Sequence, residues 1–240
     1  MTILVVGASG ATGRLLVGEL LDRGQRVRAI VRTPERLPAA LAAHPLLSVV
    51  QASVLDLDDD ALAQQVEGCS GVASCLGHNL SLRGIYGSPR RLVAHATRRL
   101  CQAVRERRPH RPVRFVLMNT AGNRNLAEPV SLGQRCIVGL VRLLLPPHRD
   151  NELAAAYLRD HLGPNEDAIE WAVVRPDSLV DEGAVSSYEV HPAPTRSAIF
   201  NPGKSSRINV AHFMADLLME EEPWSQWRGR MPVIYNHGFA

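Results

Sequence analysis

The sequence predicts an α/β fold of the Rossmann type, a doubly wound parallel sheet with a small C-terminal substrate lobe. Short apolar runs alternate with segments of helical periodicity through the first half of the chain. A glycine-rich turn joins the first apolar run to the first helical segment. No long polar linker divides the 240 residues. We therefore expect one domain over residues 1–240, with a core of sheet and helices over 1–175 and the lobe over 176–240.

The expected elements follow one another in β-α order. Apolar runs predict strands over Thr2–Val6, Arg26–Val31, Leu46–Gln51, Gly71–Leu76, Val113–Met118, Ile169–Arg175 and Met231–Tyr235. Apolar residues at helical spacing predict helices over Ala11–Arg23, Thr33–Ala43, Asp58–Val66, Pro89–Arg108, Leu132–Leu145, Arg149–His161 and Val210–Met219. The segment Asp177–Ser206 is rich in Pro, Ser and Gly, so we expect irregular structure there.

Composition excludes several classes of protein. With 45% apolar residues the chain is globular, and a net charge of +3 is too low to indicate a nucleic-acid-binding protein. Its four cysteines form no C-x-x-C pair and no zinc-finger spacing, so we expect reduced thiols and no metal site. We recognise no signal peptide, and the longest apolar stretch, Cys136–Pro147, contains Arg142 and is too short to span a bilayer. We expect a cytoplasmic protein that binds no membrane.

The strongest functional signal is the turn GASGATG, from Gly7 to Gly13, between the first strand and the first helix. Gly7 permits a tight turn, Gly10 lets the backbone approach a pyrophosphate, and Gly13 lets the helix pack close to the sheet. The helix N-terminus offers N–H groups and partial positive charge to phosphates, and Thr12 adds a hydroxyl donor. The segment predicts a dinucleotide site; the alternative is a turn with a structural role alone.

Two arginines indicate which dinucleotide binds. Arg32 ends the second strand, 19 residues after Gly13. An acid at this place binds the ribose hydroxyls of NAD, whereas an arginine accommodates the 2′-phosphate of NADP. Arg36 lies one helical turn further and can add a second guanidinium. The sequence thus favours NADP(H) over NAD(H); the alternative is that Arg32 is a solvated surface residue.

Six motifs occur along the chain in the order VVGASGATGRLL, AIVRTPERL, CLGHN, FVLMNTAG, WAVVRPDSL and RINVAHFMADLL. In this order they resemble the NAD(P)H-binding group of atypical short-chain dehydrogenases/reductases, which includes NmrA-like proteins and biliverdin reductase B. The resemblance implies a Rossmann fold and a cofactor pyrophosphate held by the first turn. The residues that would hold it are Gly7, Ser9, Gly10, Ala11, Thr12 and Gly13.

The same resemblance implies further cofactor contacts. Arg32 and Arg36 would hold the 2′-phosphate, and the adenine would lie beside Ser53 and Val54. The ribose and nicotinamide would be flanked by Leu76, Gly77, Asn151, Pro176 and Leu179. Of these, Asn151 stands at about the position of the family's lysine, and it can bond a ribose hydroxyl but supplies no cation.

One motif of the wider family is missing. Short-chain dehydrogenases that reduce carbonyls use Tyr-x-x-x-Lys, but the single lysine here, Lys204, has Phe200 at the tyrosine position. The proton then comes from another residue, or the reaction needs none from the protein, or no reaction takes place.

Three residues are candidates for handling a proton or the substrate: Thr120, His148 and Asp150. Thr120 matches the family's Ser/Thr at the end of the fifth strand, with a role in backbone hydrogen bonding as the alternative. His148 is a candidate proton donor because it is a histidine, the residue type that most often exchanges protons in enzymes. For Asp150 we favour the capping of its own helix. His78 and Asn79 could face the nicotinamide, although a loop histidine is more often exposed.

These observations predict an NADPH-dependent oxidoreductase that transfers hydride to a small, planar, apolar acceptor such as a quinone, a flavin or an aromatic ketone. The apolar segment Ile137–Leu145 would line the acceptor pocket, or it is core or a subunit contact. The alternative function is a non-catalytic NmrA-like NADP sensor, and an isomerase or lyase is a third. We expect a small-molecule partner and a monomer or homodimer. One helix face carries Arg90, Arg91, Arg98, Arg105 and Arg108, which we interpret as solvated rather than as a site for an acidic partner.

Overall fold

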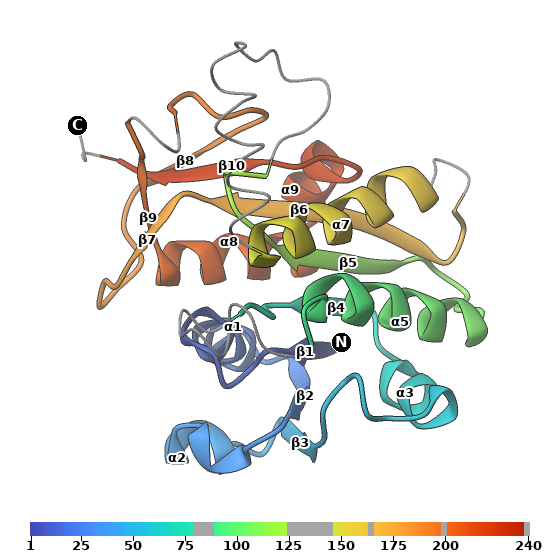
Figure 1. The fold of residues 1–240 in the computed structure, drawn as a ribbon. Helices are drawn as coiled ribbons and strands as arrows, with labels where there is room; N and C mark the ends of the chain where they lie inside the picture. Colours follow the sequence, from blue (N-terminus) through green and yellow to red (C-terminus); the bar gives the residue numbers. More distant parts are fainter. Residues whose placement is uncertain (79–88, 124–145, 163–165, 198–200, 238–240) are drawn as a thin grey trace.

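The computed structural model describes residues 1–78, 89–123, 146–162, 166–197 and 201–237 (Figure 1). Within these ranges, eight strands form one sheet in the order β3-β2-β1-β4-β5-β6-β10-β8. The bounds in this order are Leu47–Gln51, Arg26–Val31, Thr2–Val6, Gly71–Ser74, Val113–Met118, Ile169–Pro176, Val233–Asn236 and Tyr188–His191. All neighbours are parallel except β8, which is antiparallel to β10. The strand order reverses between β1 and β4.

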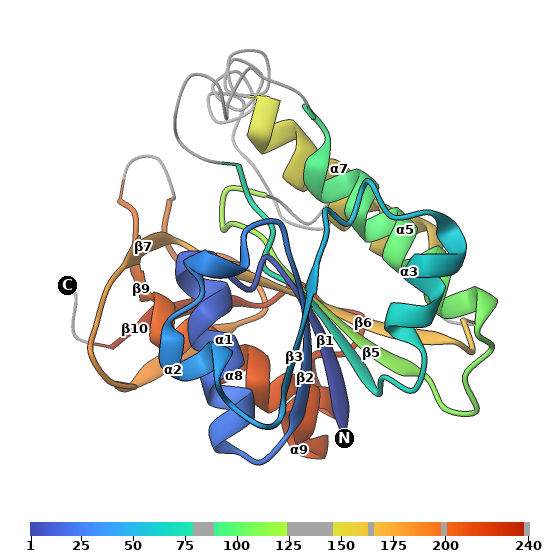
Figure 2. The ribbon, with the colours of Figure 1, turned by 90° about the horizontal axis from the view of Figure 1, so that it is seen from below.

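Helices cover both faces of the sheet (Figure 2). One face carries α1 (Ala11–Asp22), α2 (Ala39–Ala42), α8 (Arg207–Met219) and α9 (Glu221–Trp227). The other face carries α3 (Asp59–Val66), α5 (Leu92–Glu106) and α7 (Pro146–His161). The sheet order and these two helical layers confirm the doubly wound α/β fold that the sequence predicts.

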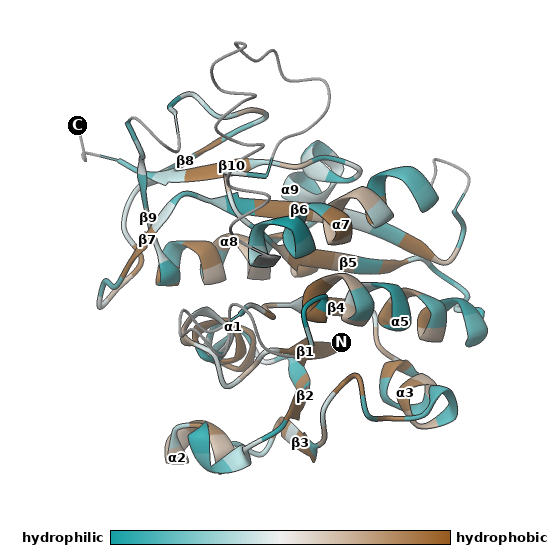
Figure 3. Ribbon diagram, in the orientation of Figure 1, coloured by the Kyte–Doolittle hydropathy of each residue, from teal (hydrophilic) through white to brown (hydrophobic). Residues whose placement is uncertain are grey.

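Two apolar cores follow from the alternation of side chains along each strand. Ile3 and Val5 of β1 pack with the α1–α8 layer, whereas Leu4 and Val6 pack with the α3–α5–α7 layer. Figure 3 shows many apolar residues on β5, β6 and β10 and a mixture of apolar and hydrophilic residues on α3, α5 and α7. Both faces of the sheet are buried, which explains why its strands read as nearly continuous apolar runs.

Several expected helices have different bounds, and prolines explain two of the differences. The helix expected from Thr33 to Ala43 is a 3₁₀ turn over Pro34–Arg36 and a separate α2, with Leu37 extended between them. Pro38 explains the break, because the residue before a proline is disfavoured in helical conformation. The helix expected from Arg149 begins at Pro146, since prolines are tolerated in the first turn, where backbone N–H groups need no acceptor.

The segment Asp177–Ser206 was expected to be irregular, and this was wrong in part. It contains β7 (Ser178–Val180), β8 and β9 (Lys204–Ser206), and β7 pairs with β9 in a second, two-stranded sheet. Strands of three or four residues are too short to show periodicity. The expected helix Leu132–Leu145 lies outside the described residues. No helix among the described residues is long and apolar enough to cross a membrane.

Candidate functional site

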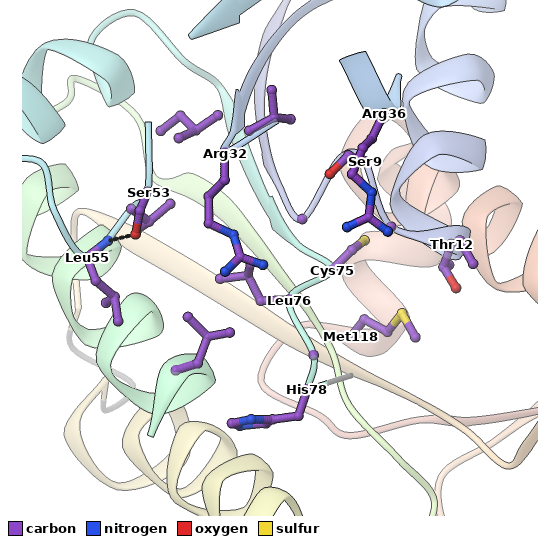
Figure 4. Close-up of a pocket in the computed structure, with 18 of the residues that line it drawn as sticks. Ser9, Thr12, Arg32, Arg36, Ser53, Leu55, Cys75, Leu76, His78 and Met118 are labelled. Carbon is purple, nitrogen blue, oxygen red and sulfur yellow. Dashed lines mark hydrogen bonds between the residues drawn. The ribbon is translucent and has the colours of Figure 1, made fainter. Parts of the chain in front are cut away.

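A pocket of about 550 Å³ opens at the carboxyl ends of β1, β2 and β4, where the strand order reverses (Figure 4). This is the place at which doubly wound sheets bind their ligands. Twelve of the residues expected to contact the cofactor line it: Gly7, Ser9, Gly10, Ala11, Thr12, Arg32, Arg36, Ser53, Val54, Leu76, Gly77 and Leu179. The remaining three, Gly13, Asn151 and Pro176, are not among its lining residues.

Close backbone contacts explain why the first turn needs glycines. Gly7 has a φ of +76°, and a Cβ there would lie 2.6 Å from the carbonyl carbon and oxygen of Cys75. A Cβ on Gly13 would lie 2.1 Å from the oxygen of Gly7. Gly13 therefore packs against the backbone of the turn and does not line the pocket. The turn brings β1, β4 and α1 together at one end of the pocket.

The N-terminus of α1 faces the same pocket through Gly10, Ala11 and Thr12. Gly10 is the N-cap residue in an extended conformation, and no side chain among the described residues caps the helix. The N–H groups of a first helical turn have no acceptor within the helix, and the helix dipole adds partial positive charge. This end of α1 suits a phosphate group.

Arg32 and Arg36 add positive charge to this side of the pocket. Figure 4 shows both guanidinium groups directed into it. Within the described ranges neither guanidinium group has a hydrogen-bond or ion-pair partner, and Asp56 is the one carboxylate among the lining residues. We call Gly7–Gly13 together with Arg32 and Arg36 the glycine–arginine side; its charge favours an anionic ligand.

The opposite boundary of the pocket is built from α5, α7 and the residues after β4. His78 follows β4 and lines the pocket, and its Nε2 lies 2.8 Å from Oδ2 of Asp150 on α7. The same Oδ2 accepts a hydrogen bond from the N–H of Val93 at 2.8 Å, and Oδ1 accepts one from Ala94 at 3.0 Å. We call His78, Val93, Ala94 and Asp150 the α5–α7 side.

One expectation for this side was wrong. Asp150 was expected to cap its own helix, but α7 begins at Pro146, and the carboxylate instead caps the N-terminus of α5. For His78 two alternatives were open, a place at the pocket and an exposed loop position; it lines the pocket, and its side chain is only 5% exposed. Asn79, considered together with it, lies outside the described residues, as does Ile137–Leu145.

Thr120 and His148 form a separate cluster that does not line the described pocket. Thr120 Oγ1 accepts a hydrogen bond from the N–H of Gly122 at 3.3 Å. A Cβ on Gly122 would lie 3.5 Å from His148 Cε1 and 3.7 Å from Thr120 Oγ1, so both side chains border this glycine. His148 Nε2 lies 3.4 Å from Glu152 Oε1. The structure thus groups Thr120 with His148 and places Asp150 with His78.

Two buried asparagines that sequence reasoning missed join β5 to α7. Asn119 Nδ2 donates to the backbone oxygen of Asn151 at 2.9 Å, and Asn119 Oδ1 accepts from the N–H of Thr120. Asn123 Nδ2 also reaches the oxygen of Asn151, at 3.3 Å. The contact of Asn151 is therefore made by its backbone. The sequence signal that could have found them is the four-residue spacing of Asn119 and Asn123.

The uncharged side chains of Cys75 and Met118 also line the pocket. Burial raises the pKa of the Cys75 thiol to about 12. Among the described residues no group of three His, Cys, Asp or Glu side chains could hold a metal ion. The tight glycine turn, the uncapped helix and the arginines fit a phosphate-bearing dinucleotide.

Comparison with known proteins supports this assignment. The NAD(P)H-binding family matches residues 7–221. The chain belongs to this family. The NAD(P)H-binding part of the expected resemblance is thereby confirmed. An uncharacterized chloroplastic protein of Arabidopsis thaliana is 26% identical over 222 residues, which are 92% of this chain and 72% of that protein.

Solved structures show the same fold. A short-chain dehydrogenase/reductase from Veillonella parvula in complex with NADP is 17% identical, with a TM-score of 0.71 over 99% of this chain and 95% of that one. An anaerobilin reductase from Escherichia coli O157:H7 is 16% identical, with a TM-score of 0.70 over 100% of this chain and 99% of that one.

Proposed function

We propose that the protein is an NADPH-dependent oxidoreductase that transfers hydride to a small, planar, apolar acceptor of the quinone, flavin or aromatic ketone type. One observation carries the cofactor preference: the guanidinium groups of Arg32 and Arg36 both enter the pocket of an NAD(P)H-binding chain without partners among the described residues. Two guanidinium groups recognise a 2′-phosphate through charge-assisted hydrogen bonds that NADH cannot form. The NADP complex of the Veillonella parvula neighbour is consistent with this preference.

The residues of the chain bind and orient, whereas the cofactor supplies the hydride when bound. The first turn of α1 holds the pyrophosphate, and Ser53 and Val54 flank the adenine. Leu76, Met118 and Leu179 give the other part of the pocket its apolar character, which suits a flat acceptor better than a sugar. The similarity in fold to a protein named anaerobilin reductase supports a reductase.

A turnover assay tests the proposal. Purified protein is mixed with NADPH and a panel of quinones, flavins and aryl ketones, and loss of the nicotinamide absorbance is followed. We expect acceptor-dependent oxidation, faster with NADPH than with NADH. Binding of NADPH without turnover of any acceptor contradicts the enzyme and favours an NADP sensor.

A further inference from the structure

The α5–α7 side holds a buried histidine–carboxylate pair at the edge of the pocket. The side chain of Asp150 is 0% exposed and that of His78 is 5% exposed, with 2.8 Å between carboxylate and imidazole. Figure 4 shows the His78 ring at the boundary of the pocket that α5 and α7 form. A buried carboxylate needs several donors to offset the loss of water. Asp150 has three: His78 and the N–H groups of Val93 and Ala94.

The N–H groups of Val93 and Ala94 hold the carboxylate of Asp150, and the carboxylate in turn orients the imidazole of His78. The carboxylate is held at the N-terminus of α5, where the helix dipole complements its charge. Because Asp150 contacts Nε2, the other ring nitrogen, Nδ1, is the one turned away from the carboxylate. A histidine oriented by a buried carboxylate in this manner is a recurring arrangement for proton transfer.

Other groups that line the pocket are less suited to give up a proton. The described lining residues that carry a carboxyl, thiol or imidazole group are Asp56, Cys75 and His78. Burial raises the pKa of Cys75 to about 12, which makes its thiol a weak acid. Asp56 follows the edge strand β3, two strands away from β1. None of the described tyrosines, Tyr157, Tyr188 and Tyr235, is among the lining residues.

We infer that His78, positioned by Asp150, donates the proton that the acceptor takes up during reduction. This inference rests on the proposed hydride transfer. The hydride brings two electrons to the acceptor, and the acceptor's oxygen or nitrogen then gains a proton. The N–H bond of the imidazolium breaks, its electron pair stays on the ring, and a new O–H or N–H bond forms. The neutral ring takes a proton from water, while Asp150 remains a carboxylate and is a positioning residue.

The charged groups around His78 come from several elements. Asp150 faces it from α7, and the N–H groups of α5 lie beyond that carboxylate. Arg32 from the end of β2 and Arg207 from α8 line the same pocket, and Arg207 is paired with Asp181 at 2.9 Å. Among the described contacts, the carboxylate of Asp150 is the charged group closest to the His78 ring.

The first test compares His78→Gln with His95→Gln, a matched change at an exposed histidine on α5. We expect kcat to fall about 100- to 1000-fold in His78→Gln, the usual contribution of a proton donor. The Kd for NADPH, from fluorescence titration, should stay within about twofold because the glycine–arginine side is untouched. His95→Gln should match the wild type. For His78→Ala, added imidazole should restore part of kcat, an effect that a purely structural histidine does not show.

A second readout needs no cofactor. Ring ¹⁵N chemical shifts of His78 in the free protein should report an Nε2–H donated to a carboxylate, and Asp150→Asn should shift them. Full activity of His78→Gln, or loss of activity in His78→Ala without imidazole rescue, overturns the proton-donor role while leaving the oxidoreductase assignment intact. Absence of turnover in the wild type overturns the oxidoreductase itself, and the inference about His78 with it.

Discussion

The glycine–arginine side and the α5–α7 side bound one pocket but are assembled differently. Every residue of the first side lies within residues 7–36, in a single β-α-β unit. The second side joins His78 to Asp150, which are 72 residues apart, and Asp150 to the start of α5, 57 residues away. The glycine–arginine side is formed by residues close together in the sequence, whereas the α5–α7 side is formed by tertiary packing of distant segments. The proposed phosphate site is thus specified by residues close together in the sequence, whereas the proposed proton donor depends on contacts between distant segments.

The largest effect should come from the backbone contact of the first side. Gly7→Ala places a Cβ 2.6 Å from the backbone of Cys75 at a φ of +76°, so β4 or α1 must shift. We expect a loss of about 2–4 kcal/mol in the free energy of unfolding, measured by urea denaturation, together with loss of NADPH binding.

Gly68→Ala is the matched control for this change. Gly68 has a similar φ of +70°, but a Cβ there meets nothing within 4 Å. The loss should be about 1 kcal/mol, the usual penalty for the conformation alone. Equal losses in the two variants would show that contact with Cys75 does not constrain the turn.

On the α5–α7 side, Asp150→Ala should have the next largest effect. It leaves the N–H groups of Val93 and Ala94 and the ring of His78 without their acceptor in a buried place. We expect about 2–3 kcal/mol of destabilisation by thermal or urea unfolding. Asp160→Ala, an exposed acid on the same helix paired with Arg159, should cost less than about 0.5 kcal/mol. If Asp150→Ala destabilised the protein no more than Asp160→Ala, the α5–α7 side would not depend on the tertiary contacts of Asp150.

The two sides also differ in how much of them can be predicted from the sequence. The fold follows from apolar runs in β-α alternation, and the first side from the spacing of Gly7, Gly13 and Arg32, because each acts through neighbours close in the chain. The bond between His78 and Asp150 could not be predicted, since no periodicity relates a loop to a distant helix. Asp150 does have capping chemistry, as expected, but the helix it caps is decided by packing.

The arginines allow a test that separates cofactor recognition from stability. Arg32→Ala should weaken NADPH binding about 10- to 100-fold, the usual value of a charge-assisted phosphate contact, and leave NADH binding nearly unchanged. Arg36→Ala should act in the same direction. Arg26→Ala, an exposed arginine at the other end of β2, is the control and should change neither affinity. Equal weakening for NADPH and NADH in Arg32→Ala would refute recognition of the 2′-phosphate.

The smallest effect concerns pH and the core behind the α5–α7 side. Cys101 of α5 is fully buried, and burial raises the pKa of its thiol. The folded protein thus keeps a proton that the unfolded chain loses near pH 8.5, so stability falls as pH rises above that value. Cys101→Ala should remove about 1 kcal/mol per pH unit from the slope between about pH 9 and 10. Parallel curves for variant and wild type would contradict the raised pKa.

The central claim, that the glycine–arginine side holds a nicotinamide dinucleotide with an extra phosphate, is tested most directly by calorimetric titration of the wild-type protein with NADPH and with NADH. The account predicts one saturable site for NADPH with an affinity about tenfold or more above that for NADH. Heat of binding for neither nucleotide, with a protein shown to be folded by its thermal transition, would contradict it.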